Sequence, residues 1–213
     1  MVVSRILCIL IGYAMGLFQT GYIYGKTQNI DIRQYGSGNA GTTNTLRTLG
    51  WKAGAITFTG DCGKAILAMF IAWLIFHDPY PDTIRLLELY AGLGAVLGHN
   101  YPFYMKFKGG KGIACTTGVI LAFHWQIAPI CIGIFLVAVL LTRYVSLGSI
   151  LLVSAFFIQL VVMGQMGYLP IESRYLPEIY ILGGIMTALA IYRHRANIKR
   201  LLSGTENKLQ LHK

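Results

Sequence analysis

The chain has 213 residues, of which 55% are hydrophobic and only 12% are charged, and its formal net charge is +10. A soluble globular domain usually carries about 25% charged residues, so this composition argues against a soluble protein and favours a helical membrane protein. No polar stretch is long enough to form a separate soluble domain, and we therefore expect one membrane domain over residues 1–213.

In chain order, the apolar segments predict an all-α fold with about seven transmembrane helices. Five spans are expected at residues 4–25, 53–76, 84–99, 147–168 and 179–192. Residues 113–142 form a longer apolar stretch that is interrupted near its middle by polar residues and a proline. At about 1.5 Å per residue, this stretch is too long for one helical span and short for two. Two short spans and a re-entrant pair both remain open.

The basic residues are distributed unevenly between the two expected faces of the membrane. Fifteen of the eighteen Lys and Arg residues lie on one face, and only Arg5, Arg85 and Arg174 lie on the other. The positive-inside rule assigns the basic face to the cytoplasm. We therefore expect an extracytoplasmic N-terminus and a cytoplasmic C-terminus. The excess charge is explained by topology and by anionic lipid or substrate, so no nucleic-acid partner is expected.

Two glycine-rich segments on the expected cytoplasmic face resemble phosphate-binding loops. Glycines let backbone N–H groups turn outward together, and neighbouring basic side chains add positive charge. Each loop taken singly is also explained as a tight turn between helices, but two together favour a phosphate site. The candidate contacts are Gly38, Asn39, Gly41, Thr42, Thr43 and Asn44 in the first segment and Gly109, Gly110 and Gly112 in the second, with Arg47 and Lys111 beside them.

Several single residues also carry expectations. Asp61 and Lys64 lie one helical turn apart in an apolar span, which predicts a buried ion pair. His99 begins the second glycine-rich segment and is expected to brace its loop. His77 and Asp82 match the H-x4-D spacing of a large acyltransferase group, but they fall on the expected outer loop, and we interpret the match as coincidence. The four cysteines fit no metal-binding spacing, so neither a metal nor a cofactor is expected.

Three segments together resemble one known family, the bacterial integral-membrane glycerol-3-phosphate acyltransferases that use acyl phosphate as donor. They are residues 36–44 (GSGNAGTTN), residues 98–118 (GHNYPFYMKFKGGKGIACTTG) and residues 194–206 (HRANIKRLLSGTE). The resemblance implies a multi-pass protein of the bacterial inner membrane with its active site on the cytoplasmic face. It also implies acyl transfer from acyl phosphate to the 1-hydroxyl of sn-glycerol 3-phosphate, giving lysophosphatidate and inorganic phosphate as the first step of phospholipid synthesis.

The resemblance further implies roles for individual residues. Ser37, His194 and Asn197 correspond to catalytic positions, and Arg47, Lys111 and Ser146 correspond to positions that bind glycerol 3-phosphate. The glycine-rich loops would hold the acyl-phosphate headgroup. His194, the donor phosphate and water all remain open as acceptors of the hydroxyl proton. The oligomeric state is left open by the sequence, with a monomer as the working expectation.

Two functions from other classes compete with this interpretation. An organophosphate transporter would need basic clusters at mid-membrane depth and commonly has inverted repeats, neither of which the sequence shows. A non-catalytic lipid-binding scaffold predicts a diffuse basic patch rather than compact loops rich in glycine and asparagine. Both alternatives are therefore weaker than the acyltransferase.

Overall fold

The computed structural model describes residues 1–209, and over that range it contains helices and loops but no β-strand. Short 3-10 turns occur at Ile32–Gln34, Pro81–Thr83, Phe103–Met105 and Ser173–Tyr175. The α-helices are α1 (Val2–Gly16), α2 (Thr20–Thr27), α3 (Thr42–Leu49), α4 (Trp51–Phe76), α5 (Ile84–Asn100), α6 (Ile113–Phe123), α7 (Ile127–Thr142), α8 (Val145–Gln165), α9 (Leu176–Arg193) and α10 (Arg195–Leu202).

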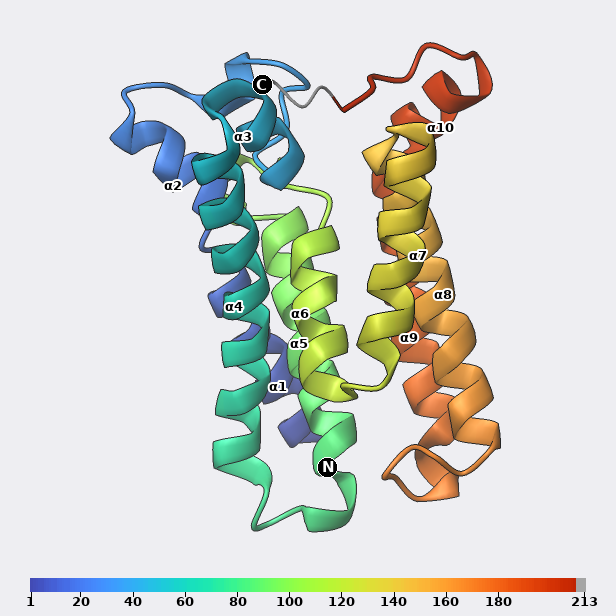
Figure 1. The fold of residues 1–213 in the computed structure, drawn as a ribbon. Helices are drawn as coiled ribbons and strands as arrows, with labels where there is room; N and C mark the ends of the chain where they lie inside the picture. Colours follow the sequence, from blue (N-terminus) through green and yellow to red (C-terminus); the bar gives the residue numbers. More distant parts are fainter. Residues whose placement is uncertain (210–213) are drawn as a thin grey trace.

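The long helices stand side by side, while the short helices α2, α3 and α10 gather at one end (Figure 1). Helices α1, α4, α5 and α6 form one group, and α7, α8 and α9 form a second group beside it. The N-terminus lies at the end away from α3 and α10. Both glycine-rich segments, the start of α8 and the start of α10 therefore meet at one end of the bundle.

Helix α5 is the buried centre of the bundle and packs at very close range against α1. Its Gly94 and Gly98 face the backbone of α1, where Gly12 and Gly16 face α5 in return. A Cβ added at Gly12 would lie 1.9 Å from the carbonyl oxygen of Ala91, so a larger residue would push the helices apart. Small residues spaced four apart on both helices are a typical device for tight packing in membranes. This contact fixes the end of α5, from which the second glycine-rich segment emerges.

Four helical segments are long and apolar enough to cross a membrane, namely Val2–Thr27, Trp51–Phe76, Val145–Gln165 and Ser173–Arg193. The ambiguous stretch 113–142 forms two separate helices, α6 and α7, joined by a short turn. With 11 residues, α6 is only about 17 Å long, which is less than the hydrocarbon thickness of a bilayer. The total of seven crossings and the orientation of the termini remain predictions.

The span expected at residues 4–25 lies within the membrane-long segment Val2–Thr27, but this segment is not one continuous helix. It breaks between α1 and α2, where Gln19 is buried and donates to the carbonyl oxygens of Gly16 and His99 at 3.2 and 3.1 Å. The carbonyl oxygen of Phe18, freed from the helical pattern, accepts a hydrogen bond from the Lys64 ammonium. The break thus gives the buried Lys64 ammonium a hydrogen-bond acceptor, the Phe18 carbonyl oxygen. The hydrophobicity of the segment alone could not predict such a break.

Candidate active site

A cavity of about 380 Å³ lies at the α3 end of the bundle and has two different kinds of wall. One part is apolar and is formed by α4, α6, α7 and α8, including Phe58, Ile132, Phe135 and Leu136. The other part is polar and is formed by the two glycine-rich segments and α10. The sequence-predicted residues that line this cavity are Ser37, Asn39, Gly41, Thr42, Thr43, Asn44, Arg47, Lys111, Gly112, Ser146, His194 and Asn197.

The first glycine-rich segment is held in shape by its own asparagines. The Asn44 amide accepts from the backbone N–H of Ser37 at 2.8 Å and donates to the carbonyl oxygens of Ile32 and Tyr35 at 3.1 and 3.0 Å. Both of its N–H donors are therefore used inside the loop, and Asn44 supports the loop rather than offering a donor to a ligand. Asn39 accepts from the N–H of Gly41 at 2.9 Å and so directs the chain into α3.

The second glycine-rich segment differs from the expected nest of outward-facing amides. The N–H groups of Gly109 and Gly110 donate to the carbonyl oxygens of Asn100 and His99, both at 3.1 Å. The Arg193 guanidinium in turn donates to the Gly109 and Gly110 carbonyl oxygens at 2.8 and 2.9 Å. The expectation was wrong for these two amides, because the end of α5 already binds them. These hydrogen bonds tie the segment that precedes Lys111 to the end of α5 and to Arg193.

Free amide donors are found instead at the starts of two helices. Gly41 precedes α3 and Gly112, with φ of 85°, precedes α6. The first N–H groups of an α-helix have no partner within the helix, and the aligned peptide dipoles make that end attractive to anions. Thr42 and Ile113, the first residues of the two helices, both line the cavity. Two helix starts thus meet the same space.

Charged residues complete the polar wall. Lys111, Arg47 and Arg200 line the cavity from three separate elements. The Lys111 ammonium donates to the side-chain oxygen of Asn197. Burial lowers the pKa of Lys111 to about 8, with further lowering from the neighbouring arginines, while Glu206 opposes the shift. Lys111 is therefore charged at neutral pH but close to its titration point.

Glu206 is a site residue that the sequence interpretation missed. Its carboxylate accepts from Ser146 Oγ at 3.0 Å, from Asn197 Nδ2 at 2.7 Å and from Arg200 Nε at 2.8 Å. It therefore holds together the start of α8, the start of α10 and the tail beyond α10. Glu206 is the single acid in the otherwise basic tail from residue 193 onward, and this exception was the available signal.

Ser146, which precedes the span expected at residues 147–168, lies in the first turn of α8 and is only 6% exposed. The connection between α7 and α8 is short, because Arg143 takes a left-handed conformation that ends α7 and lets α8 begin at Val145. This early start brings Ser146 inside the cavity and within reach of Glu206.

His194 lies between α9 and α10 and is 3% exposed. Its Nδ1 is 2.7 Å from the Ala190 carbonyl oxygen, which can only accept, so Nδ1 carries the proton and Nε2 has a free lone pair. Burial, followed by the nearby Lys111 charge, lowers the pKa of His194 to about 4. The ring is consequently neutral at physiological pH. Helix α9 ends just before His194 and α10 begins just after it, and His194 and Asn197 both line the cavity.

A second cavity of about 770 Å³ lies on the other side of Lys111. It shares Ser37, Lys111 and Asn197 with the first, and it is lined by further basic residues, including Arg33 and Lys108. Ser37 is exposed and stands at the junction of the two spaces. Gly38 and Gly109 line only this second cavity, whereas Gly110 lines neither.

The H-x4-D pair contributes nothing to this site. His77 follows the end of α4, stacks on Trp73 with ring centroids 4.3 Å apart, and contacts Asp78 rather than Asp82. This turn lies at the opposite end of the bundle from α3 and α10 (Figure 1). Among residues 1–209, no group of three His, Cys, Asp or Glu side chains is placed to hold a metal ion.

Comparisons with known proteins agree with one another. A family model described as glycerol-3-phosphate acyltransferase matches residues 6–204. A protein of that name from Alkaliphilus metalliredigens (strain QYMF) is 43% identical over 208 residues, covering 96% of each chain. Another from Thermoanaerobacter sp. (strain X514) is 40% identical over 207 residues, covering 96% of this chain and 95% of the relative.

Solved structures are similar as well. The crystal structure of PlsY (YgiH), an integral membrane glycerol 3-phosphate acyltransferase, in its glycerol 3-phosphate form matches with a TM-score of 0.83 and 34% identity. The match covers 97% of this chain and 96% of that chain. The lysophosphatidic acid form of the same protein matches with a TM-score of 0.81.

Proposed function

Because this chain belongs to the glycerol-3-phosphate acyltransferase family, we propose that its acyl donor is an acyl phosphate and its acceptor the 1-hydroxyl of sn-glycerol 3-phosphate. The products are lysophosphatidate and inorganic phosphate. Membership of an acyltransferase family favours acyl transfer over the two alternatives considered from the sequence, a transporter and a lipid-binding scaffold.

The observation that carries this proposal is the mixed lining of the 380 Å³ cavity. An acyl phosphate has an apolar tail and an anionic head joined directly at the reacting carbon. The apolar residues Phe58, Phe135 and Leu136 suit the tail, while Lys111 and the starts of α3 and α6 suit the head. An acyl-CoA carries its phosphates far from its thioester, so a cationic wall beside the reaction centre fits acyl phosphate better.

The chemistry requires positioning more than covalent catalysis. An acyl phosphate is a mixed anhydride and is already activated, so no nucleophilic side chain is needed. The hydroxyl oxygen attacks the acyl carbon and forms the ester bond, the bond from that carbon to the phosphate oxygen breaks, and phosphate leaves with the electron pair. Lys111, Arg47 and the helix starts lower the repulsion between two anionic substrates and stabilise charge on the departing phosphate.

His194 orients the attacking hydroxyl through the lone pair on Nε2. Its pKa of about 4 makes it a weak base, and general bases work best when their pKa is near the operating pH. Even a phosphate monoester has a second pKa of about 6. The inorganic phosphate that leaves with the electron pair is more basic than a monoester, so it is a better proton acceptor than His194. The hydroxyl proton therefore goes to the phosphate, and Asn197 with Glu206 fixes the position of Lys111.

The remaining parts of the proposal concern the setting of the enzyme. The chain forms one domain and acts as a monomer in the inner membrane, with its active site on the cytoplasmic face, where glycerol 3-phosphate is available. The asymmetry of basic residues supports this orientation. The second cavity, lined by Arg33 and Lys108, gives the water-soluble substrate a polar approach to Lys111.

A donor comparison tests the proposal. Purified protein in detergent micelles is given radiolabelled glycerol 3-phosphate with either palmitoyl phosphate or palmitoyl-CoA as sole donor. We expect labelled lysophosphatidate from palmitoyl phosphate and at least a hundredfold less from palmitoyl-CoA. Comparable turnover with the two donors would refute the choice of donor while leaving the acyltransferase assignment intact.

A further inference from the structure

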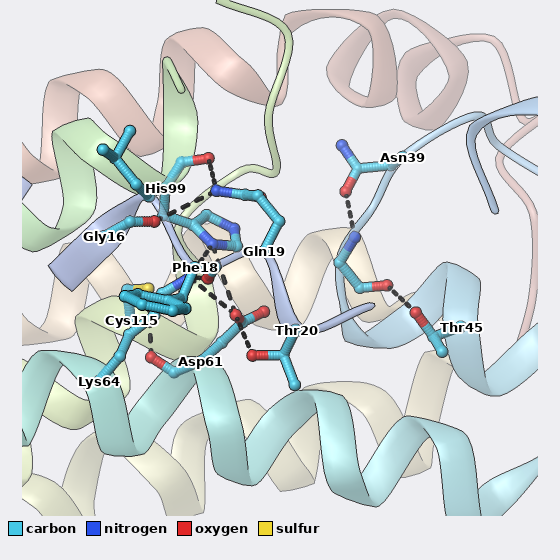
Figure 2. Close-up of polar contacts among 12 residues, drawn as sticks. Gly16, Phe18, Gln19, Thr20, Asn39, Thr45, Asp61, Lys64, His99 and Cys115 are labelled. Carbon is cyan, nitrogen blue, oxygen red and sulfur yellow. Dashed lines mark hydrogen bonds and ion pairs between the residues drawn. The ribbon is translucent and has the colours of Figure 1, made fainter. Parts of the chain in front are cut away.

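A buried polar cluster lies against the second glycine-rich segment, and the proposed reaction gives it no role. Asp61 and Lys64 of α4 are 1% and 6% exposed, and His99 of α5 is 3% exposed (Figure 2). Asp61 Oδ1 accepts hydrogen bonds from Lys64 Nζ at 2.8 Å and from Thr20 Oγ1 at 3.0 Å. Charged groups inside a membrane bundle are costly and usually functional, so this cluster needs an explanation beyond packing.

The hydrogen bonds of the cluster fix the His99 ring. The Lys64 ammonium donates to Asp61 and to the carbonyl oxygen of Phe18, and its third contact is His99 Nδ1 at 2.9 Å. An ammonium group can only donate, so Nδ1 is the acceptor and Nε2 carries the ring proton. The ring therefore has one tautomer and one orientation, which are set by α4 and by the break after α1.

The opposite edge of this ring lies against Gly110. The three atoms nearest to a Cβ added at Gly110 are all in the His99 ring, with Nε2 at 2.0 Å and the two flanking carbons at 2.8 and 2.9 Å. The Nε2 edge therefore faces the loop, and the loop covers it. Gly110 does not have a positive φ, so glycine is needed here for the close approach of the ring and not for an unusual backbone angle.

Gly110 is also held by hydrogen bonds on both sides of its peptide group. Its N–H donates to the His99 carbonyl oxygen at 3.1 Å, and its own carbonyl oxygen accepts from the Arg193 guanidinium at 2.9 Å. Lys111 follows directly in the chain, lines both cavities and donates to Asn197. The contacts of Gly110 therefore set the point from which the Lys111 side chain starts.

We propose that His99 is a positioning residue for Lys111, because its ring, held by the Asp61–Lys64 ion pair, supports Gly110 and so keeps the Lys111 ammonium where a substrate phosphate binds. The inference rests on the proposed function for the phosphate that Lys111 contacts. A misplacement of about 1 Å in an active site can cost about a hundredfold in rate. A buried ion pair contributes little net stability, but a fully hydrogen-bonded one holds a single arrangement, as a positioning role requires.

Substitutions on the two sides of the contact separate positioning from general stability. His99→Ala removes the support of Gly110, whereas His99→Gln keeps most of the side-chain volume and an amide oxygen that can accept from Lys64. Gly110→Ala adds a methyl group that overlaps the ring, and in the double variant His99→Ala/Gly110→Ala this methyl group enters the space that the ring has left. Glu178→Gln is the control for a lost ion pair, because Glu178 pairs with Arg5 at 2.5 Å and lines neither cavity.

The kinetic comparison tests the contact between the ring and the loop. We expect His99→Ala to lower kcat/KM for glycerol 3-phosphate by roughly ten- to a hundredfold and His99→Gln to keep most of the activity. Gly110→Ala, inactive alone, should regain activity when it is combined with His99→Ala. Glu178→Gln should leave kcat/KM unchanged even where it lowers the melting temperature. Equal losses in the two His99 variants, or a double variant as inactive as Gly110→Ala, would overturn the proposal.

The pKa of Lys111 is a readout that a merely structural role would not move, and its measurement needs no substrate. Burial lowers this pKa from the ordinary value of 10.5 to about 8. If the loop loosens, the ammonium gains water and its pKa rises. The pH at which Lys111 reacts with an amine reagent, followed by mass spectrometry of its peptide, should therefore move upward in His99→Ala. The charged and titratable groups around Lys111 are the same in all variants, namely Arg47, Arg193, His194, Arg200 and Glu206. An unchanged Lys111 pKa in folded His99→Ala would overturn the proposal.

A spectroscopic measurement keeps the test independent of whether His99→Ala folds. Protein labelled with 15N-histidine is used, and three of the five histidines are replaced, namely His77, His124 and His212. The two remaining rings should show opposite tautomers, Nε2–H at His99 and Nδ1–H at His194. Two Nδ1–H rings would mean that Lys64 does not hold the His99 ring and would refute the proposal. Failure of the donor comparison alone would leave this result and the Lys111 labelling result standing.

Discussion

Replacing Lys111 with alanine should separate catalysis from stability. Lys111 lies where the glycine-rich segment, Asn197 and the cavity meet, and its ammonium is partly withdrawn from water. A charge-assisted hydrogen bond to a substrate phosphate contributes about 1.5–3 kcal/mol. Since about 1.4 kcal/mol corresponds to a factor of ten, Lys111→Ala should lower kcat/KM by roughly ten- to more than a hundredfold.

The assay is initial-rate formation of lysophosphatidate, with thermal unfolding followed on the same preparations. Lys108→Ala is the matched control, because Lys108 precedes the glycine pair, is exposed and lines only the second cavity. It should lower kcat/KM less than Lys111→Ala does, because Lys108 is exposed and its charge is screened by water. His77→Ala and Asp82→Asn, at the far end of the bundle and outside both cavities, should leave kcat/KM within about threefold, as surface substitutions generally do.

The ranking of these variants is what matters. If Asp82→Asn abolished transfer while Lys111→Ala kept full activity, the H-x4-D pair would be the catalytic pair and the site described here would be wrong. If Lys111→Ala lost activity only in proportion to a lower melting temperature, its role would be structural.

Three further predictions concern pH, packing and topology. Because a Lys111 with a pKa of about 8 loses its charge as pH rises, kcat/KM for glycerol 3-phosphate should fall above about pH 8. Arginine stays charged at this pH, so any activity that remains in Lys111→Arg should not fall above pH 8. If the fall persists in that variant, a group other than Lys111 causes it. Gly110→Ala should abolish activity, because its Cβ would lie 2.0 Å from His99 Nε2. Gly133→Ala, which has open space around its Cβ, should leave activity unchanged. Equal activities of the two variants would contradict the packing described for Gly110. The last of these predictions uses a background without native cysteines and an impermeant thiol reagent. Ser203→Cys should react only after the cytoplasmic face is exposed, and Asp78→Cys should react from outside. The reverse pattern would contradict the proposed topology.

Local pattern was sufficient to predict much of the fold. Spans expected at residues 53–76 and 84–99 correspond to α4 and α5 almost residue for residue, because each is a continuous apolar helix. The Asp61–Lys64 ion pair was also confirmed, at 2.8 Å. An i,i+3 pair of opposite charges in an apolar span has few other ways to be satisfied.

Features that depend on contacts between distant segments could not be predicted. The break after α1 exists because Gln19 and the Phe18 carbonyl group bind groups on α5 and α4. The amides of Gly109 and Gly110 are taken up by the end of α5, which a glycine pattern does not indicate. Glu206 joins Ser146 to Asn197, which precede it in the sequence by 60 and 9 positions. The sequence thus indicated which segments line the cavity but not which of their donors are already bound within the protein.

The most direct test of the whole account follows a labelled oxygen through the reaction. Purified protein is given glycerol 3-phosphate and palmitoyl phosphate that carries 18O in the oxygen bridging carbon and phosphorus. Attack at the acyl carbon predicts lysophosphatidate without the label and an equal amount of inorganic phosphate that contains it. Retention of the label in free palmitate, or formation of lysophosphatidate only when acyl-CoA is supplied, would contradict acyl transfer from acyl phosphate at this site.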